Sequence, residues 1–516
     1  MNCAFVLVLI APLLPLLAAF GIAAHILTGR ASGDAAEAPT ARLAEGAAWL
    51  ALVLLLALDA LALVEGAPGH FVLGTWFESG SFNIPISFMI DGLALSAATL
   101  VALIGAVSLH FSRNYLHREA GFHRFFMLMS LFLSGMLLIV LAGNVVLTFV
   151  GWELCGLTSF LLIGYAYERP VATGNALYAF LSNRIGDAGF VLGISLAAWW
   201  VGSVEWTGLA QWATGAAGTS TGGFDKVTAR LLLFGFLLAA VIKSAQLPFA
   251  AWIARALEGP TPSSAIFYGA LMVHAGVYLV IRLAPVLIQV PDIMVYLALI
   301  GGATALYGWL AGLVQTDVKS SLIFSTTLHV GLMFFTCGLG WFELAAWHMG
   351  MHAIWRAWQF LLAPSYMHSA EGPAGPAPRW LAGRQWLYTA ALQRFWLENL
   401  ARNILIRPCQ AIGRDMRDFD DKVLSHLVGM PERWRAGPLA ENDQVVIRGH
   451  GLAGRLLYAI AEAFRHLESH LLMKRTGGSF SRLLQGLGKY LLLLESLIEQ
   501  PRYLILVIVA TFIVIL

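Results

Sequence analysis

Long apolar runs separated by short loops leave few folds open to this chain. About 20 apolar residues in a helix cross the hydrocarbon core of a bilayer, where only helices and closed barrels satisfy their backbone hydrogen bonds. Only 12% of the 516 residues are charged, against about 25% in globular proteins. The sequence predicts an all-α, polytopic transmembrane protein of about 11–13 spans, with apolar runs near 4–28, 46–65, 92–112, 125–143, 146–166, 177–200, 230–253, 264–286, 294–314, 321–338 and 343–363.

Basic residues in the short loops predict the orientation, because Lys and Arg favour the cytoplasmic side. The 66–90 connection carries no Lys or Arg and is placed outside, whereas the 113–124 loop carries three arginines and is placed inside. Alternation from these loops puts the N-terminus outside. The same alternation brings the polar loops near Arg169, Arg255–Gly259 and Asp317–Lys319 inside. The first run lacks a basic n-region and a cleavage site, so we interpret it as a retained span.

The sequence changes character after residue 364. A Pro/Gly linker, EGPAGPAPR, interrupts the helical pattern, and residues 365–502 hold 18 of the 32 Lys and Arg residues. The stretch VVIRGHGLAGRLLYAIAEAFRHLESHLLMKR is amphipathic; it suits a lateral helix that braces a partner and equally an ordinary cytoplasmic helix. We divide the chain into four parts. Residues 1–79 are N-terminal transmembrane helices and a loop, and residues 80–364 are the transmembrane core. Residues 365–502 are a cytoplasmic amphipathic region, and residues 503–516 are a terminal apolar helix.

One segment combines an ionisable residue with helix breakers at membrane depth. Lys243 lies inside the 230–253 run and is followed by Pro248 and by the block Gly259-Pro260-Thr261-Pro262. A lysine at the centre of a span costs about 2.5–3.5 kcal/mol on insertion scales, so such residues tend to be functional. A proline frees a backbone carbonyl that a neighbour or a cavity water must satisfy. We predict part of a proton or cation path, with helix breaks at Pro248, Gly259, Pro260 and Pro262.

Glu153 is the lone charge in the 146–166 run. Its carboxyl group is either neutral and hydrogen-bonded between helices, or paired with a cation and titrating. Burial disfavours the charged form of both a carboxylate and a lysine, so a Glu–Lys pair at this depth can exchange a proton near neutral pH. Lys243 is the expected partner of Glu153. Asp187, beside Arg184, is interpreted as a local structural ion pair at a helix end.

Two further runs carry polar groups. His274, in GALMVHAGVYLVIR, is either a satisfied core histidine or a relay member, because neutral imidazole both donates and accepts. Lys319 lies near the start of its run, where a lysine also snorkels to the surface. His329 follows after several hydroxyl residues, a polar density that indicates either a hydrated half-channel or hydrogen bonds between helices.

His348 and His352 are spaced i, i+4 and share a helix face with Arg356, four residues further on. The spacing also suits a metal ion, but no Glu or Cys ligands accompany it, and the four cysteines have no CxxC or CxxH spacing. We predict no metal site, no cofactor and no catalytic residue in this chain, and instead a proton wire that ends in a fixed cation. The net charge of +2 gives no indication of nucleic-acid binding.

These residues resemble those of the antiporter-like family, the proton-pumping subunits of respiratory complex I and the large subunits of Mrp-type antiporters. The matching stretches are FMIDGLALSAATLVALIGAVSLHFSRNYL, VGWELCGLTSFLLIGY, KSAQLPFAAWIARALEGPTPSSA, AGVYLVIR and LVQTDVKSSLIFST, within roughly 80–364. The resemblance implies that Glu153 and Lys243 are the family's glutamate–lysine pair. It further implies that Lys319 is the family's central lysine and that His348 and His352 are its paired histidines.

Three departures from the family pattern stand out. Tyr268 occupies the place of a histidine soon after the GPTP block, and a histidine follows instead at His274. Arg356, which cannot release a proton, replaces a lysine. The family's later spans, which complete the exit half-channel, have no counterpart, so we expect no ordinary complex I path within this chain.

A short antiporter-like core with a cytoplasmic tail is similar to the DabB-type subunits of bacterial inorganic-carbon transporters. That resemblance implies a hetero-complex in the bacterial inner membrane with a large cytoplasmic zinc protein of DabA type. Flow of H+ or Na+ would then drive hydration of CO2 to bicarbonate in the partner, and zinc would belong to the partner. The N-terminus would be periplasmic and residues 365–502 cytoplasmic. The alternatives are a proton- or sodium-translocating subunit of a complex I-like or Mrp-type complex, and a non-conducting membrane scaffold.

Overall fold

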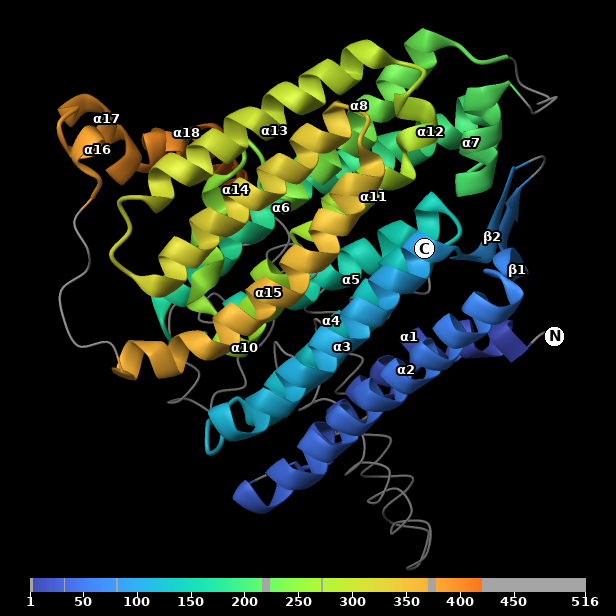
Figure 1. Cartoon of the computed structure of the whole chain (residues 1–516). Coiled ribbons are helices and arrows are strands. Elements are labelled where there is room, and N and C mark those ends of the chain that lie inside the picture. Colours follow the sequence, from blue (N-terminus) through green and yellow to red (C-terminus); the bar gives the residue numbers. More distant parts are fainter. Residues whose placement is uncertain are drawn as a thin grey trace, which may run out of the picture. The chain divides into compact units, whose positions relative to one another are not determined.

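The computed structural model describes residues 3–31, 33–79, 82–215, 223–270, 272–369 and 377–419. The described residues are mostly helical (Figure 1), as predicted. The first half contains α1 Cys3–Leu27, η1 Asp34–Ala36, α2 Glu37–Glu65, β1 Gly69–Ser79, β2 Phe82–Ile90, α3 Gly92–Tyr115, α4 Phe122–Leu141, α5 Val145–Ile163, α6 Pro170–Leu196, η2 Ala197–Val201, α7 Trp206–Thr214 and α8 Lys226–Lys243. The second half contains α9 Ala251–Arg255, η3 Ala256–Glu258, α10 Thr261–Ser264, η4 Ala265–Ala270, α11 His274–Arg282, α12 Ala284–Leu287, α13 Pro291–Gly312, α14 Val318–Gly338, α15 Phe342–Ser369, α16 Arg379–Ala382, α17 Gln385–Leu392, η5 Arg394–Trp396, α18 Leu397–Ala401, η6 Arg402–Ile406 and α19 Arg407–Phe419.

Each predicted apolar run coincides with a helix or with an interrupted pair of helices. Among the described residues, 7 helices are long and apolar enough by themselves to cross a membrane: α1, η1 with α2, α3, α4, α5, α13 and α14. The predicted 230–253 and 264–286 runs are interrupted, the first between α8 and α9 and the second between α10 and α11. The prediction of a polytopic helical membrane protein is therefore confirmed. The amphipathic stretch near 445–475 and the last apolar run lie outside the described residues.

The all-α expectation is wrong at the 66–90 connection, which forms an antiparallel hairpin of β1 and β2. The sequence FNIPISFMI of β2 combines β-branched and aromatic residues, which fit a half-buried pleated surface. The hairpin is tied to the turn between α4 and α5, because Asn144 Nδ2 donates to Pro85 O at 2.7 Å. Gly143 N likewise donates to Ser87 O at 2.8 Å. The loop is therefore a fixed part of the fold.

Glycines bring the helices of the core into close contact. A Cβ at Gly189 of α6 would lie 2.8 Å from Gly235 O of α8, and one at Gly301 of α13 would lie 2.6 Å from Gly331 O of α14. Small residues at such crossings let helix backbones approach, which is how helices associate where lipid is the competing apolar phase. The α6–α8 and α13–α14 pairs thereby form the close-packed frame around the interrupted helices (Figure 1).

The loops that we predicted to lie inside meet on one face of the fold. Thr261 Oγ1 is hydrogen-bonded to Tyr115 Oη at 2.9 Å and accepts from Lys319 Nζ at 2.5 Å. Arg169 forms an ion pair of 2.7 Å with Glu258. The hairpin lies at the other ends of these helices, so the two loop sets that we placed on opposite sides of the membrane do lie at opposite ends (Figure 1).

Asp91 anchors the junction between the hairpin and α3. Its carboxylate caps α3 by accepting from Ala94 N at 2.8 Å, as an N-cap aspartate does. It also accepts from Arg282 Nη2 of α11 at 2.8 Å. Burial by itself would raise the pKa of Asp91, but the hydrogen bonds and charge of Arg282 and the Ala94 N–H outweigh burial and hold this pKa below its ordinary value.

Candidate functional site

The first cluster of charged side chains joins α5 and α6. Glu153 Oε2 accepts from Arg184 Nη1 at 2.6 Å, and Arg184 Nη2 forms an ion pair of 2.7 Å with Asp187 Oδ2. The second oxygen of Asp187 accepts from the Trp152 indole Nε1 at 2.9 Å. Arg184 and Asp187 are three residues apart and therefore share one face of α6. We name Glu153, Arg184, Asp187 and Lys243 the carboxylate–lysine cluster.

Lys243 completes this cluster from the broken end of α8. It is the last residue of that helix and 1% exposed. Its Nζ donates to Trp152 O at 3.2 Å and lies 5.0 Å from the centroid of the Trp152 ring. A Cβ at Gly156 would lie 3.1 Å from Arg184 Nη2 and 3.5 Å from Lys243 Nζ. Glycine at this position lets both cations approach α5, since a methyl group would be in tight contact with the Arg184 guanidinium.

The geometry revises two expectations from the sequence. Glu153 does not pair directly with Lys243 in this structure; its ion-pair partner is Arg184, with Lys243 beside it in the same cluster. Asp187 is buried and lies in the interior of α6 rather than at a helix end. The structure therefore brings two carboxylates and two cations together where the sequence indicated a single Glu–Lys pair.

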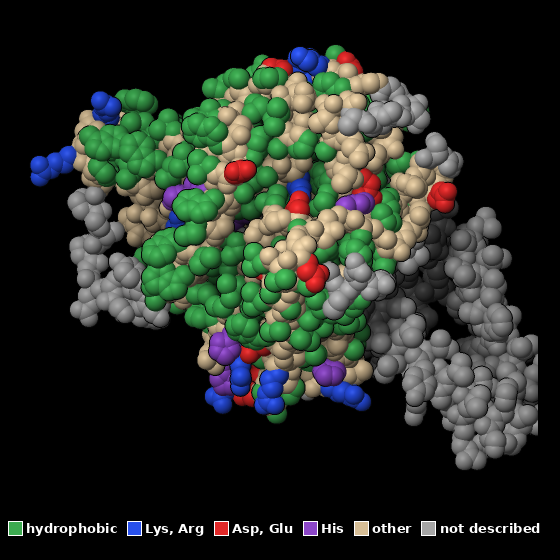
Figure 2. Space-filling view, turned by 45° about the vertical axis from the view of Figure 1, so that its right-hand side comes forward, with side chains coloured by type: hydrophobic (Ala, Val, Ile, Leu, Met, Phe, Trp, Pro, Cys, Tyr) green, Lys and Arg blue, Asp and Glu red, His purple; other side chains and the backbone are tan. Residues whose placement is uncertain are grey.

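The carboxylate–lysine cluster is open on one side. The side chains of Glu153 and Arg184 are 30% and 34% exposed, although both belong to helices at membrane depth. The face drawn in Figure 2 is largely apolar, and its Lys and Arg side chains lie mostly near the edges of the molecule. Charged groups facing lipid are costly, so this side of the cluster requires protein or water against it.

The two helix breaks touch each other. Ser244, directly after Lys243, donates through Oγ to Val273 O at 2.6 Å, and Val273 directly precedes His274. A Cβ at Gly276 would lie only 2.3 Å from Ala240 O of α8, so α8 and α11 cross in direct backbone contact. The broken end of α8 is otherwise satisfied internally, because Trp252 Nε1 donates to Ile242 O at 2.8 Å and satisfies a terminal carbonyl. This hydrogen bond therefore joins the residue that follows Lys243 to the residue that precedes His274.

The second cluster gathers four histidines and an arginine from α11, α14 and α15. His274 Nε2 lies 2.9 Å from His352 Nδ1, and His329 Nδ1 lies 3.0 Å from His348 Nε2. Arg356 donates through Nε to His352 Nε2 at 3.3 Å. We name His274, His329, His348, His352 and Arg356 the histidine cluster. All five are residues predicted from the sequence, and the fold brings them together.

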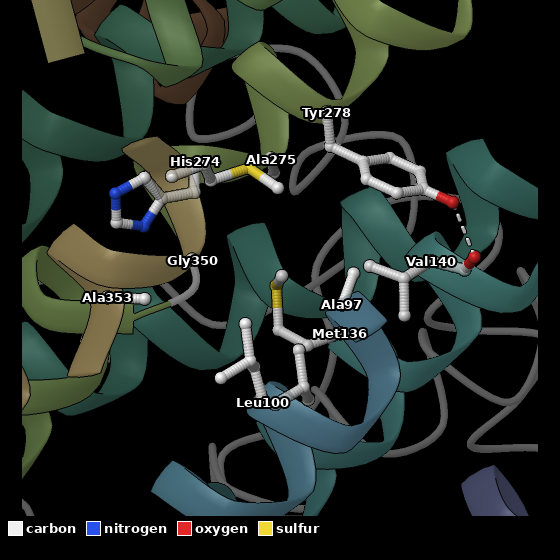
Figure 3. Close-up of a pocket in the computed structure, with 11 residues that line it drawn as sticks. Ala97, Leu100, Met136, Val140, His274, Ala275, Tyr278, Gly350 and Ala353 are labelled. Atoms are coloured by element: carbon white, nitrogen blue, oxygen red, sulfur yellow. Dashed lines mark hydrogen bonds between the residues drawn. The ribbon is translucent and has the colours of Figure 1, made fainter. Parts of the chain in front are cut away.

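A cavity of about 30 Å³ adjoins His274 on the side of α3 and α4. Its wall is mainly apolar and includes Leu100, Met136 and Met349. The volume is large enough for one water molecule, which needs roughly 10–15 Å³. In Figure 3, the rings of His274 and Tyr278 lie at opposite ends and point away from each other. Tyr278 Oη donates to Val140 O at 2.6 Å.

The remaining predicted residues lie apart from both clusters. Lys319 is half-buried and hydrogen-bonded to Thr261 at the loop face, near one end of the fold. Gly259 is fixed by close approach, because a Cβ there would lie 2.9 Å from Leu162 O. Pro260 precedes α10, Pro262 lies in its first turn, and the Leu247–Pro248 peptide is cis. The glycine and the three prolines mark helix breaks, whereas Lys319 lies at the start of α14.

The sequence does not predict the contacts of three residues: Arg184, Ser244 and Thr261. The sequence indicates Arg184 only as the local ion-pair partner of Asp187, which by itself accounts for the charge of Arg184. Ser244 and Thr261 carry no signal of their own, although each lies in a breaker segment beside a lysine or a proline. Among the described residues, no group of three His, Cys, Asp or Glu has the arrangement of a metal site.

Two family models match the chain. Residues 142–374 match the model described as NADH:quinone oxidoreductase/Mrp antiporter, TM. Residues 76–126 match the model described as NADH-Ubiquinone oxidoreductase (complex I), chain 5 N-terminus. The first match contains both clusters.

Curated relatives include subunit 5 of NAD(P)H-quinone oxidoreductases. The protein from the organellar chromatophore of Paulinella chromatophora is 34% identical over 372 residues, which cover 72% of this chain and 55% of the relative. The chloroplastic protein of Hordeum vulgare is 36% identical over 315 residues, 61% of this chain and 42% of the relative. The chain spans about half the length of these relatives.

Among solved structures, a chain of the Mrp complex from Dietzia sp. DQ12-45-1b aligns with a TM-score of 0.59. The alignment covers 98% of this chain and 63% of that chain, at 23% identity. The likeness shows a shared fold.

Proposed function

We propose that this chain is an antiporter-like subunit of a membrane complex and translocates protons through its two clusters. The proposal is supported by the matches of residues 76–126 and 142–374 to models of complex I and Mrp antiporter subunits. The observation that carries the proposal is the contact between the two helix breaks. Lys243 ends α8, His274 begins α11, and the Ser244–Val273 hydrogen bond joins the broken ends.

The chemistry of the two clusters suits proton transfer. Carboxylate, lysine and imidazole all bind and release protons, whereas guanidinium only donates hydrogen bonds. The proposed transfer moves a proton between Lys243 and Asp187 or Glu153. Lys243 Nζ donates to Trp152 O in this structure, so its side chain must turn toward a carboxylate before the proton is passed. Arg184 keeps both carboxylates near a positive charge and holds them in place. Interrupted helices at such sites are typical of membrane transporters.

The partner is proposed to be another membrane subunit that covers Glu153 and Arg184. Both side chains are about a third exposed at membrane depth, where an uncovered charge is unfavourable. The relatives named above are subunits of NAD(P)H-quinone oxidoreductase and a chain of an Mrp complex. These matches favour the complex I or Mrp alternative over the inorganic-carbon interpretation.

Coupling to CO2 hydration is kept as a second, finer proposal. It rests on the resemblance to DabB-type subunits, namely an antiporter-like core followed by a cytoplasmic tail, and on the basic composition of residues 365–502. A pull-down in mild detergent, with partner identification and zinc analysis, separates the two complexes. A single large soluble zinc protein supports carbon coupling, whereas a set of membrane subunits without zinc supports the complex I or Mrp assembly.

Proton translocation is tested with Glu153→Gln and Asp187→Asn in proteoliposomes under an imposed pH gradient. Both variants keep the shape of the side chain and remove the carboxylate that accepts protons, so we expect proton flux to fall to the level of empty liposomes. Arg230→Gln is the matched control, because Arg230 forms an exposed ion pair with Asp292 at 2.8 Å, on α8 but away from Lys243. Full proton flux in both carboxylate variants would contradict translocation through this cluster and would instead support a non-conducting scaffold.

A further inference from the structure

The hydrogen bonds of Arg356 determine where protons sit in the histidine cluster. Its Nε donates to His352 Nε2 at 3.3 Å, and its Nη2 donates to Ser325 Oγ of α14 at 2.6 Å. A guanidinium has five N–H donors, no acceptor, and a charge that it keeps at any physiological pH. His352 Nε2 must therefore present its lone pair to Arg356. The side chain of Arg356 is 3% exposed, so water does not compete freely for this contact.

This contact fixes the tautomers of two histidines. A neutral imidazole whose Nε2 accepts carries its proton on Nδ1. His352 Nδ1–H therefore donates to His274 Nε2, 2.9 Å away, and a neutral His274 carries its own proton on Nδ1. The hydrogen bonds thus run in one direction, from Arg356 through His352 to His274.

A proton relay along this line has a defined entry atom. An incoming proton bonds to His352 Nε2, the Nδ1 proton of His352 moves to His274 Nε2, and the Nδ1 proton of His274 passes to a water molecule, which carries it away as hydronium. One proton enters, one leaves, and both rings end neutral. The entry atom is the nitrogen that Arg356 occupies. Resting on the proposed function, we propose that Arg356 is a gate on the His352–His274 relay and is closed in this structure.

The second histidine pair supplies the proton and the force that opens the gate. His329 and His348 are half-buried, and the His329 ring lies 5.0 Å from that of His352, tilted by 37°. Within the described part of the chain, no hydrogen bond joins this pair to His352. A proton that arrives on His329 places a second positive charge beside His352, the residue that Arg356 contacts. Two positive charges so close together repel each other strongly in a low-dielectric site. The guanidinium then moves away from His352 while Ser325 still holds Nη2.

A guanidinium that only ties α14 to α15 is the competing explanation. It shares the Ser325 hydrogen bond but makes no prediction about flux or tautomers. In the part of the chain that the structure describes, no carboxylate lies within ion-pair distance of Arg356, so its charge acts on the histidines without local compensation. The 3.3 Å bond to His352 is longer than the 2.6 Å bond to Ser325, as expected for the contact that opens.

The test compares proton flux of the full-length chain in liposomes for wild type, Arg356→Met and Arg230→Met. Methionine replaces the unbranched apolar stem of the arginine side chain but has neither charge nor donor. We expect Arg356→Met to raise flux roughly tenfold, the factor given by losing one hydrogen bond to a charged group, and Arg230→Met to leave it unchanged. The added flux must disappear when Lys243→Met is combined with Arg356→Met. Unchanged or lower flux in Arg356→Met, or added flux that survives Lys243→Met, overturns the gate.

A spectroscopic readout keeps the gate testable if the proposed function itself fails. Nitrogen-15 spectra of histidine-labelled protein report which ring nitrogen carries the proton, with His352 assigned by comparison with His352→Asn. We expect the Nδ1–H tautomer at His352 in wild type and its loss in Arg356→Met. An Nε2–H tautomer in wild type, or one that Arg356→Met does not change, contradicts the gate even where no variant conducts protons.

Discussion

Gly276→Ala tests the contact that joins the two clusters. An added methyl group at Gly276 would lie 2.2 Å from Ser244 Oγ and 2.3 Å from Ala240 O. Side-chain carbons essentially never lie closer than 3.0 Å to such atoms, so α8 and α11 must separate by at least about 0.7 Å, and close-packed interiors do not absorb such a shift locally.

The expected cost is that of overpacking, about 1–3 kcal/mol of folding free energy. The same shift lengthens the 2.6 Å bond from Ser244 Oγ to Val273 O, so we expect proton flux to fall further than stability does. Thermal unfolding in detergent and proton flux in liposomes measure the two effects on one preparation. The control is Gly302→Ala on α13, where the added methyl group meets Phe335 at an ordinary 3.4 Å. An unchanged unfolding temperature and full flux in Gly276→Ala would refute the claim that the two breaks are in contact.

Three further predictions follow from single contacts. Gly156→Ala places a methyl group 3.1 Å from Arg184 Nη2; we expect reduced flux at nearly normal thermal stability, because the flexible guanidinium yields, and equal flux would show that the cation spacing is unimportant. Ser325→Ala removes the second anchor of Arg356; we expect flux between that of wild type and Arg356→Met, and flux below wild type would contradict the gate. The pKa of Asp91 lies below its ordinary value, so its contribution to stability is complete above the unfolded-state pKa of about 3.9 and is lost as the pH falls through the lower folded value. Asp91→Asn should therefore lower the unfolding temperature throughout pH 5–8, with a difference from wild type that shrinks below about pH 4; a constant difference down to pH 3 would contradict this.

The sequence predicts the helices and the identity of most cluster residues, because these depend on local composition. Lys243 and His274 lie beside breakers that are visible in the sequence, and the His348, His352 and Arg356 stripe follows from a spacing of four within one helix. Pairing between helices depends on the rotation of each helix about its axis, which the apolar runs do not determine. The sequence therefore predicts Lys243 as the partner of Glu153, whereas the rotation of α6 places Arg184 against it.

The β hairpin escaped prediction for a different reason. The lack of Lys and Arg in the 66–90 connection predicts only the side of the membrane on which it lies. It gives no information about the backbone conformation. Its β-branched and aromatic residues are typical of strands, and Asn144 and Gly143 anchor the hairpin from a turn about 60 residues away. A contact of that kind has no signature in the local sequence.

Proton flux through Lys243→Met, compared with wild type at equal protein content in liposomes, tests the central claim most directly. Methionine matches the length of lysine and lacks any group that binds a proton, and Lys243 is the residue at which the carboxylate–lysine cluster meets the broken helix. The account predicts that flux falls to that of empty liposomes, while thermal unfolding shows a folded protein. Wild-type flux in a folded Lys243→Met variant would contradict it.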